Sequence, residues 1–368
     1  MRVGFYSPLP PVRSGVADYS AALLSSLPGD VIVGADGDVN LYHMGNNGLH
    51  AEIYARALAR PGVVVLHDAV LHHFHLGALS RAAYLDEFVY CYGGWYRGMA
   101  EGLWAERSRS ASDERYFRWP MLRRLAERSL AVIVHNEGAA EMVRREAPSA
   151  RIEVIPHLPL PAPPVDPVDV ELWRSQNGVR PSQTLFGVLG YLRESKRVMA
   201  VLRVFTRLRA MRDDVWLLLA GQIGSSDLDR AIEPFLDGPG ILREAHLPEA
   251  DFQMRAAACD VGVNLRYPGG GESSGMTARW LGIGRPVIVS DTPENAALPA
   301  VGCPRVAIGA SEEVALAAVM IWFAESAVRR RECGRAGREW AEREMQLSAI
   351  AQRYWQVLSA FSRAGFCS

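Results

Sequence analysis

Lysine is almost missing from this sequence. Of the 40 lysine and arginine residues, only Lys196 is a lysine. A lysine presents a compact and mobile ammonium, whereas arginine presents a rigid planar fork, so the two are not interchangeable where a point charge is needed. In a chain that otherwise uses arginine, we interpret Lys196 as a functional residue. The alternative is a surface lysine that is present by chance.

Other absences exclude whole classes of protein. No run of 18 apolar residues is present, which excludes a membrane-spanning helix, and no signal-peptide pattern follows Met1. We therefore expect a cytoplasmic protein with at most peripheral contact at the inner membrane face. A net charge of −1 argues against nucleic acid as a partner. The cysteines are odd in number, far apart and without a C-x-x-C, which favours reduced thiols over disulfides or zinc: Cys91, Cys259, Cys303, Cys333 and Cys367.

The chain is long enough for two domains, with 368 residues of which 49% are hydrophobic. Short apolar runs alternate with stretches of helical periodicity in both halves, which predicts an α/β fold with mainly parallel sheets. The proline-rich residues 156–167 mark the boundary. The predicted strands are residues 2–6, 31–33, 39–43, 63–66, 130–134, 152–155, 185–189, 215–220, 241–242, 261–265, 286–289 and 305–308.

Strand signals stop between residues 70 and 128, where the sequence looks helical and rich in tyrosine, tryptophan and phenylalanine. Three interpretations stay open for this insertion. Its aromatic side chains could pack on the sheet, form a platform for an acceptor substrate, or lie on an anionic membrane surface.

Residues 261–291 combine a buried strand, a Pro/Gly loop, the start of a helix and a second strand. Free backbone N–H groups and the positive end of the helix dipole suit an anion such as phosphate. Glu272 stands between the glycines and the helix, and an ionised carboxylate accepts hydrogen bonds from hydroxyl groups. A nucleotide sugar carries both features. The alternative is a flexible surface loop with Glu272 in water.

A second loop, residues 190–197, follows the first strand of the second half and opens a helix. Lys196 would therefore lie at the carboxyl edge of a sheet, where ligands bind in open α/β folds. There it could neutralise a diphosphate leaving group. Arg193 could join it, or could be a solvated loop charge. The first half opens in the same way, but its loop, residues 7–15, is not G-x-G-x-x-G, which argues against a dehydrogenase.

Residues 186–197, 217–221 and 259–291, in this order and spacing, resemble the donor domain of glycosyltransferase family 4. Enzymes of that family have the GT-B fold, in which two Rossmann-like doubly wound domains face each other across a cleft, and they retain anomeric configuration. The resemblance implies an acceptor-side domain at 1–160, with a helical insertion at about 70–128, and a donor domain at 161–346. It also implies that 347–368 form a helix that crosses back to the first domain.

The resemblance assigns roles to individual residues. The G-x-L-x-x-x-K loop from Gly190 to Lys196 would hold the donor diphosphate, and Glu272, which begins an E-x7-E element, would bind hydroxyls of the donor sugar. Gly15 resembles a glycine near the leaving phosphate, and His67 a histidine beside the donor sugar. The expected catalytic residues are Glu272, Lys196 and His67. The expected donor-binding residues are Gly15, Gly190, Arg193, Lys196, Glu272, Ser273, Ser274, Gly275, Met276 and Thr277.

Two positions depart from the family pattern. Trp280 stands where the second glutamate of E-x7-E would hold the ribose, and Ala297 stands where a later glutamate is usual, with Glu294 three residues early. Another group must then hold the ribose, or the site binds its donor weakly.

A histidine-rich stretch follows the strand at 63–66. His67, His72 and His75 could approach one another as metal ligands, but a GT-B transferase needs no metal, and we expect no metal and no cofactor. On the acceptor side we expect Asp68, Asp18 and His72. The carboxylates could accept from sugar hydroxyls, although helix capping is the competing role for both.

The sequence therefore predicts a retaining glycosyltransferase that uses a nucleoside diphosphate-sugar, with UDP and GDP as the nucleotides considered, and a saccharide, glycolipid or other small acceptor. A donor phosphate oxygen would take the acceptor proton. A weakly active or non-catalytic nucleotide-sugar binding protein of the same fold is one alternative. A nucleotide-sugar epimerase is another, although it would need a convergent acid/base pair.

Overall fold

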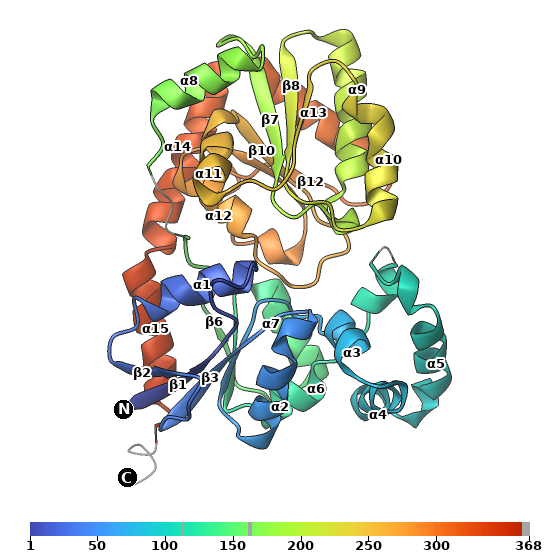
Figure 1. Cartoon of the computed structure of the whole chain (residues 1–368), viewed down its shortest axis with the longest axis vertical. Coiled ribbons are helices and arrows are strands. Elements are labelled where there is room, and N and C mark those ends of the chain that lie inside the picture. Colours follow the sequence, from blue (N-terminus) through green and yellow to red (C-terminus); the bar gives the residue numbers. More distant parts are fainter. Residues whose placement is uncertain (112, 161–163, 363–368) are drawn as a thin grey trace. The chain divides into compact units, whose positions relative to one another are not determined.

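The computed structural model of the protein describes residues 1–111, 113–160 and 164–362. The chain forms two compact units (Figure 1). The first comprises Met1–Leu160, Pro268–Ser273 and Met345–Ser368, and the second Pro161–Tyr267 and Ser274–Glu344. Part of the predicted linker (161–163), the end of the predicted last helix (363–368) and Cys367 lie outside the described residues.

The first unit is built on a sheet of six parallel strands in the order β2-β1-β3-β4-β5-β6. Side chains along β4, for example, alternate between two hydrophobic clusters. Val63 and Val65 enter one cluster and Val64 and Leu66 the other, so both faces are covered. The strands are β1 (Arg2–Tyr6), β2 (Asp30–Val33), β3 (Val39–Met44), β4 (Val63–Leu66), β5 (Ala131–Val134) and β6 (Ile152–Val154).

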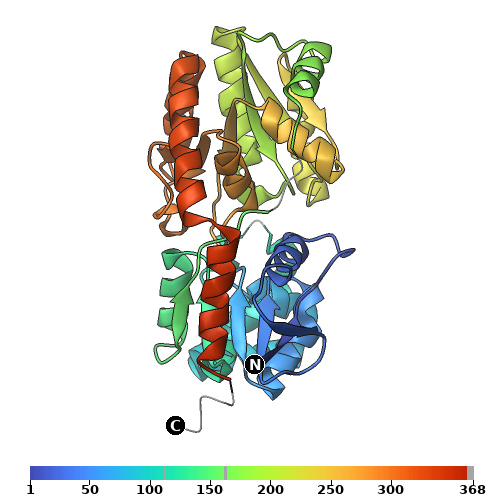
Figure 2. The same ribbon diagram turned by 90° about the vertical axis from the view of Figure 1, so that its left-hand side faces the viewer.

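Helices α1 (Gly15–Leu24) and α15 (Leu347–Ser359) cover one face of this sheet. Figure 2 shows α15, in red, along the first unit. Its Tyr354 is fully buried, and the hydroxyl of Tyr354 lies 2.8 Å from that of Tyr19 on α1. Helices on the other face are α2 (Ala51–Ala59), α6 (Arg123–Arg128) and α7 (Glu137–Glu146), with a short 3-10 turn at Gly48–His50 before α2.

The predicted insertion is helical, and its aromatic side chains pack mainly on one another. Tyr84, Phe88 and Tyr116 are fully buried in a cluster of their own, whereas Trp95 is 95% exposed. Packing is therefore the interpretation that the structure supports, but in a separate small core and not on the sheet. The insertion contains α3 (His72–Ala78), α4 (Arg81–Tyr92), α5 (Arg97–Ala105) and 3-10 turns at Gly94–Tyr96, Arg107–Arg109 and Glu114–Phe117.

The second unit has a second sheet of six parallel strands, in the order β12-β11-β10-β7-β8-β9. One face packs against α9, α10 and α13. The strands are β7 (Thr184–Leu189), β8 (Val215–Ala220), β9 (Ile241–Glu244), β10 (Val261–Asn264), β11 (Val287–Ser290) and β12 (Arg305–Val306). The helices are α8 (Pro167–Gln176), α9 (Val198–Met211), α10 (Ser226–Leu236), α11 (Glu249–Ala258), α12 (Gly275–Gly282), α13 (Glu312–Ala324) and α14 (Ala327–Glu344), with 3-10 turns at Glu194–Lys196 and Pro293–Asn295.

The strand orders confirm the predicted α/β class and place the ligand-binding edge of each sheet. In the first unit the order reverses between β1 and β3, and in the second between β7 and β10. Loops leave such a pair of strands in opposite directions, and ligands of open α/β sheets bind outside their carboxyl ends. In the second unit the predicted donor loops follow these two strands.

Candidate active site

Lys196 lies beyond the carboxyl end of β7, in the second unit. Its side chain is buried, and its Nζ donates a hydrogen bond of 2.8 Å to the carbonyl oxygen of Leu189, the last residue of β7. Gly190 follows with a φ of 98°, and a Cβ at this position would stand 3.0 Å from Nζ. Glycine is therefore favoured here both by the backbone conformation and by the close approach of the ammonium.

The first turn of α12 adjoins Gly190. Ser274 caps the helix, accepting a 3.4 Å hydrogen bond from the amide of Thr277. The Thr277 hydroxyl in turn accepts a 2.8 Å bond from the side-chain amide of Asn264, the last residue of β10. Met276 Cγ would lie 3.7 Å from a Cβ on Gly190. The structure thus gathers Gly190, Lys196 and the start of α12 at the point where the strand order reverses.

Arg193 does not join this group. Its side chain is exposed, and its guanidinium lies 6.0 Å from the centroid of the Tyr191 ring. The exposed side chain is compatible with the solvated alternative, and the diphosphate contact stays a prediction.

Trp280, which stands where the family pattern has its second glutamate, is a core residue. Its indole is fully buried and donates a 3.3 Å hydrogen bond from Nε1 to the carbonyl oxygen of Ala256. It fills a notch over Gly262 in β10, where a Cβ would stand only 2.4 Å from the ring. Because this position faces the core, its side chain cannot hold a ribose.

Glu272 lies in the short segment Pro268–Ser273, which belongs to the first unit. Its Oε2 accepts a 2.7 Å hydrogen bond from the amide of Gly270, and the carbonyl oxygen of Gly270 accepts one of 2.7 Å from the amide of Ala69. Asp68 precedes Ala69, and its Oδ2 accepts a 3.0 Å bond from the amide of Asn46. The Glu272 segment and the loop after β4 therefore lie side by side.

Both ring nitrogens of His67 lie within hydrogen-bonding distance of other histidines. Its Nε2 lies 3.0 Å from Nδ1 of His43, and its Nδ1 lies 3.3 Å from Nε2 of His135. Nδ1 of His135 lies 3.0 Å from the carbonyl oxygen of Ile155. Since both ring nitrogens of His67 have protein partners, the predicted contact between this side chain and a donor sugar is not supported.

These histidines form a directional hydrogen-bonded chain. Burial lowers the pKa of His43 and of His135 to about 3, and lowers that of His67 well below its ordinary value, so all three are neutral near pH 7. The carbonyl of Ile155 can only accept, so Nδ1 of His135 carries its proton. The same logic places the protons of His67 and His43 on Nδ1. Nε2 of His43 is left as a buried lone pair without a partner in the described part of the chain.

The start of α1 lies near the histidine chain through Tyr19. The Tyr19 ring centroid is 4.7 Å from that of His67. Ser14 caps the helix by accepting a 3.1 Å bond from the amide of Ala17, and Gly15, the first helical residue, is exposed. Asp18 is also exposed and remains a candidate for the acceptor side, as does half-buried Asp68.

His72 is the third residue that we expect on the acceptor side. It is fully buried in the insertion, with Nδ1 2.9 Å from the carbonyl oxygen of Trp119 and Nε2 2.8 Å from the hydroxyl of Tyr84. Both nitrogens are used within the protein, so an acceptor-binding role has no free group on this side chain.

The described residues contain no group of three or more His, Cys, Asp or Glu that could hold a metal ion. None of the described helices is long and apolar enough to cross a membrane.

Asn46 and Asn136 contact the loops of the candidate site but are not among the site residues predicted from the sequence. Asn46 follows β3 at the reversal point of the first sheet, and its Oδ1 accepts a 2.8 Å bond from the amide of Phe74. Asn136 follows β5 and donates to the Glu272 segment. An asparagine just after a predicted strand was the available signal, but its long-range partners were not visible in the sequence.

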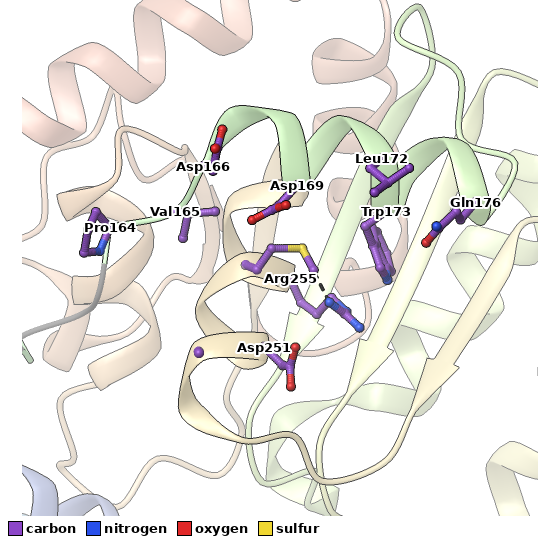
Figure 3. A pocket seen from close by; sticks show the side chains of 11 residues that line it. Pro164, Val165, Asp166, Asp169, Leu172, Trp173, Gln176, Asp251 and Arg255 are labelled. Carbon is purple, nitrogen blue, oxygen red and sulfur yellow. Dashed lines mark hydrogen bonds between the residues drawn. The ribbon is translucent and has the colours of Figure 1, made fainter.

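A hollow of about 470 Å³ lies in the second unit between α8 and α11 (Figure 3). Asp166, Asp169 and Asp251 line it together with Trp173 and Arg255. It shares no residue with the candidate site. Arg255 is bonded to Glu244 at 2.7 Å.

Comparisons with known proteins identify the fold. No protein-family model and no curated protein matches the chain. Sucrose-phosphate synthase from Thermosynechococcus elongatus matches with a TM-score of 0.67 and 14% identity, over 98% of this chain and 100% of that one. HepE from Anabaena, solved with UDP and glucose, matches with a TM-score of 0.63 and 14% identity, over 98% and 100%. The chain has the GT-B fold.

A third GT-B structure agrees with this assignment. WaaG, a glycosyltransferase involved in lipopolysaccharide biosynthesis, matches with a TM-score of 0.62 and 16% identity, over 97% of this chain and 99% of that one. These GT-B matches span nearly the full length of each protein, so the likeness covers both units.

Proposed function

We propose that this GT-B chain is a retaining glycosyltransferase that moves a sugar from a nucleoside diphosphate-sugar to a saccharide, glycolipid or other small acceptor. The observation that carries the proposal is the buried ammonium of Lys196, which lies beside Gly190 where the strand order reverses. In addition, HepE, which shares the fold, has been solved with UDP-glucose. UDP-sugars are therefore the first donors to test.

The diphosphate would bind to Lys196 and to the first amides of α12, at Gly275 and Met276. An ammonium and the amino-terminal end of a helix both favour negative charge. Glu272 would accept hydrogen bonds from hydroxyls of the donor sugar. It precedes Gly275, the first residue of α12, by three residues in the chain.

The proposed reaction needs no nucleophile from the protein. The acceptor hydroxyl forms a new bond to the anomeric carbon on the face from which the diphosphate departs, while the bond from that carbon to the phosphate oxygen breaks. The acceptor proton passes to a donor phosphate oxygen. Lys196 and the α12 amides stabilise the charge that develops on the diphosphate, and the remaining contribution is positioning.

The buried Trp280 favours a second candidate, a non-catalytic nucleotide-sugar binding protein of the same fold. Without a carboxylate at this position, and with exposed Ala297 at the other, the ribose lacks the two anchors that the family resemblance implied. A protein of this kind would bind the donor and leave its glycosidic bond intact.

Donor turnover separates the two candidates. The protein is incubated with a panel of UDP- and GDP-sugars, and release of nucleoside diphosphate is measured for wild type, Lys196→Ala and Arg193→Ala. We expect slow hydrolysis of at least one donor and loss of this activity in Lys196→Ala. A loss in Arg193→Ala would support its predicted diphosphate contact, whereas full activity of that variant would support the solvated alternative. Retention is checked by NMR of the first-formed anomer. Binding without release would favour the non-catalytic candidate, and full activity of Lys196→Ala would contradict the proposed site.

A further inference from the structure

The segment Pro268–Ser273 belongs to a different unit from the residues on either side of it in the chain. It connects β10 to α12, which both belong to the second unit, yet the segment itself belongs to the first. Specific contacts within the first unit must therefore hold it, and they also set the position of Glu272.

Asn136 supplies two of these contacts, across 135 and 137 residues of sequence. Its Nδ2 donates a hydrogen bond of 2.9 Å to the carbonyl oxygen of Gly271 and one of 3.0 Å to the hydroxyl of Ser273. These are the residues immediately before and after Glu272. The side chain of Asn136 is 5% exposed, so water does not compete freely for these bonds.

The orientation of the Asn136 amide is fixed by its surroundings. Its Oδ1 accepts a 2.7 Å hydrogen bond from the amide of Ala139 and so caps α7. An N–H group can only donate and a carbonyl can only accept, so rotating the amide by 180° would break the cap and the bond to Gly271 together. The cap therefore points both N–H groups of Nδ2 at the Glu272 segment.

Gly271 shows how closely the segment approaches. Its φ is 75°, and a Cβ there would stand 2.5 Å from Cβ of Ala69 and 3.3 Å from Cβ of Ala139. The amide of Ala69 also donates to the carbonyl oxygen of Gly270 at 2.7 Å. The segment is thus seated between the loop after β4 and the start of α7.

We infer that Asn136 is a positioning residue for Glu272: it holds the backbone on both sides of this carboxylate, and so sets how Glu272 meets the sugar of a bound donor. The donor part of this inference rests on the proposed function. The claim that Asn136 holds the segment Pro268–Ser273 does not rest on the proposed function, and it can be measured without any ligand.

The test uses Asn136→Ser, because serine also caps helices well but lacks the amide donor. Hydrogen exchange followed by mass spectrometry should show faster exchange in peptides that cover residues 268–273 and residue 69, with α7 and the melting temperature little changed. Asn136→Ala removes the cap as well and should additionally destabilise α7. Unchanged exchange in the Glu272 segment of Asn136→Ser would overturn the inference.

Gly271→Ala provides a second, independent perturbation, and Gly34→Ala is its matched control. Gly34 has a φ of 73°, and a Cβ there would meet nothing within 4 Å, so both variants bear a similar backbone strain. Only Gly271→Ala should displace the segment from Ala69 and raise its exchange. Equal hydrogen exchange of residues 268–273 in the two variants would contradict the close approach of Gly271 to Ala69.

Donor kinetics complete the test. If wild type turns over a nucleotide sugar, Asn136→Ser should lower kcat/KM by about tenfold to a hundredfold, because small misplacements of positioned groups have effects of this size. Glu272→Gln should give a comparable loss. Loss in Glu272→Gln with none in Asn136→Ser would overturn the positioning role. If wild type binds no nucleotide sugar, the proposed function fails, and hydrogen exchange still decides whether Asn136 holds the segment.

Discussion

The ammonium of Lys196 donates a 2.8 Å hydrogen bond to the carbonyl oxygen of Leu189, and it would have to shift if Gly190 carried a Cβ, which would stand 3.0 Å away. This relationship predicts the effect of Gly190→Ala, with Gly309→Ala as control. The two glycines have φ values of 98° and 96°, but a Cβ on Gly309 would meet nothing within 4 Å. Both variants should lose about 1–3 kcal/mol of unfolding free energy from backbone strain. Only Gly190→Ala should reduce donor kcat/KM; equal kinetics in both variants would contradict the close approach.

The buried indole of Trp280 leads to a second prediction. Trp280→Glu restores the glutamate of the family motif in sequence, but it places a carboxylate in the core beneath β10. Replacing a buried tryptophan by a small residue costs about 3–5 kcal/mol, and an unpaired buried charge adds to this cost. Urea denaturation should show a loss of at least this size. Trp95→Glu, at a side chain that is 95% exposed, should change stability by less than about 0.5 kcal/mol. A stable Trp280→Glu variant with tighter nucleotide binding would show that position 280 faces the ligand.

Acid sensitivity is the third prediction. Burial lowers the pKa of His43, His72 and His135 from 6.5 to about 3, and that of His50, His75 and His157 to about 4. Between about pH 4 and 6.5 the unfolded chain therefore binds more protons than the folded one, and the free energy of unfolding rises with pH. Stability should be lost as the pH falls through this range.

The measurement is urea denaturation from pH 8 down to pH 4.5. Each histidine with a lowered pKa contributes a slope of up to about 1.4 kcal/mol per pH unit. His43→Leu should reduce that slope, and above about pH 7 these groups should contribute none. A flat profile between pH 6.5 and 4.5 would show that the histidines are not neutral and buried together.

The pair Tyr19 and Tyr354 gives the fourth prediction. Their hydroxyls, 2.8 Å apart, are fully buried and link α1 to α15. Either single change to phenylalanine leaves one hydroxyl without its partner, which should cost about 1–3 kcal/mol. The double variant removes both hydroxyls and should be less destabilised than the sum of the two single variants. Additive effects in this double-mutant cycle would mean that the two hydroxyls do not interact.

The sequence predicted the strands well because both sheets are parallel and buried on both faces. Buried parallel strands such as β4 and β7 are continuous apolar runs, which are easy to recognise. The loops that follow β7 and β10 could be placed at the ligand-binding edge by the same reasoning, which is why the group around Lys196 was foreseen.

The surroundings of the predicted site residues could not be read from the sequence, because they depend on long-range packing. Nothing near His67 in sequence indicates that His43 and His135, 24 and 68 residues away, occupy its two nitrogens. Trp280 was recognised as a departure from the family pattern, but its direction depends on Gly262 in a neighbouring strand. His72 was likewise assigned to an acceptor although Tyr84 and the carbonyl of Trp119 use both of its nitrogens.

The association of Glu272 with the first unit was also outside the reach of sequence patterns. Local reasoning placed this residue in a loop between a strand and a helix of the second half. Ala69 and Asn136, which bond to the residues around Glu272, lie in the first half of the chain, about 200 and 135 residues earlier. Only the folded arrangement shows that a segment this short belongs to the first unit.

The central claim is that Lys196 and the first turn of α12 bind a diphosphate, and calorimetric titration with nucleoside diphosphates tests it most directly. Wild type should bind at least one nucleoside diphosphate, more tightly than the corresponding monophosphate. Lys196→Ala should weaken this binding by tenfold or more. Equal affinity of wild type and Lys196→Ala for every nucleoside diphosphate, or no binding by either, would contradict the account.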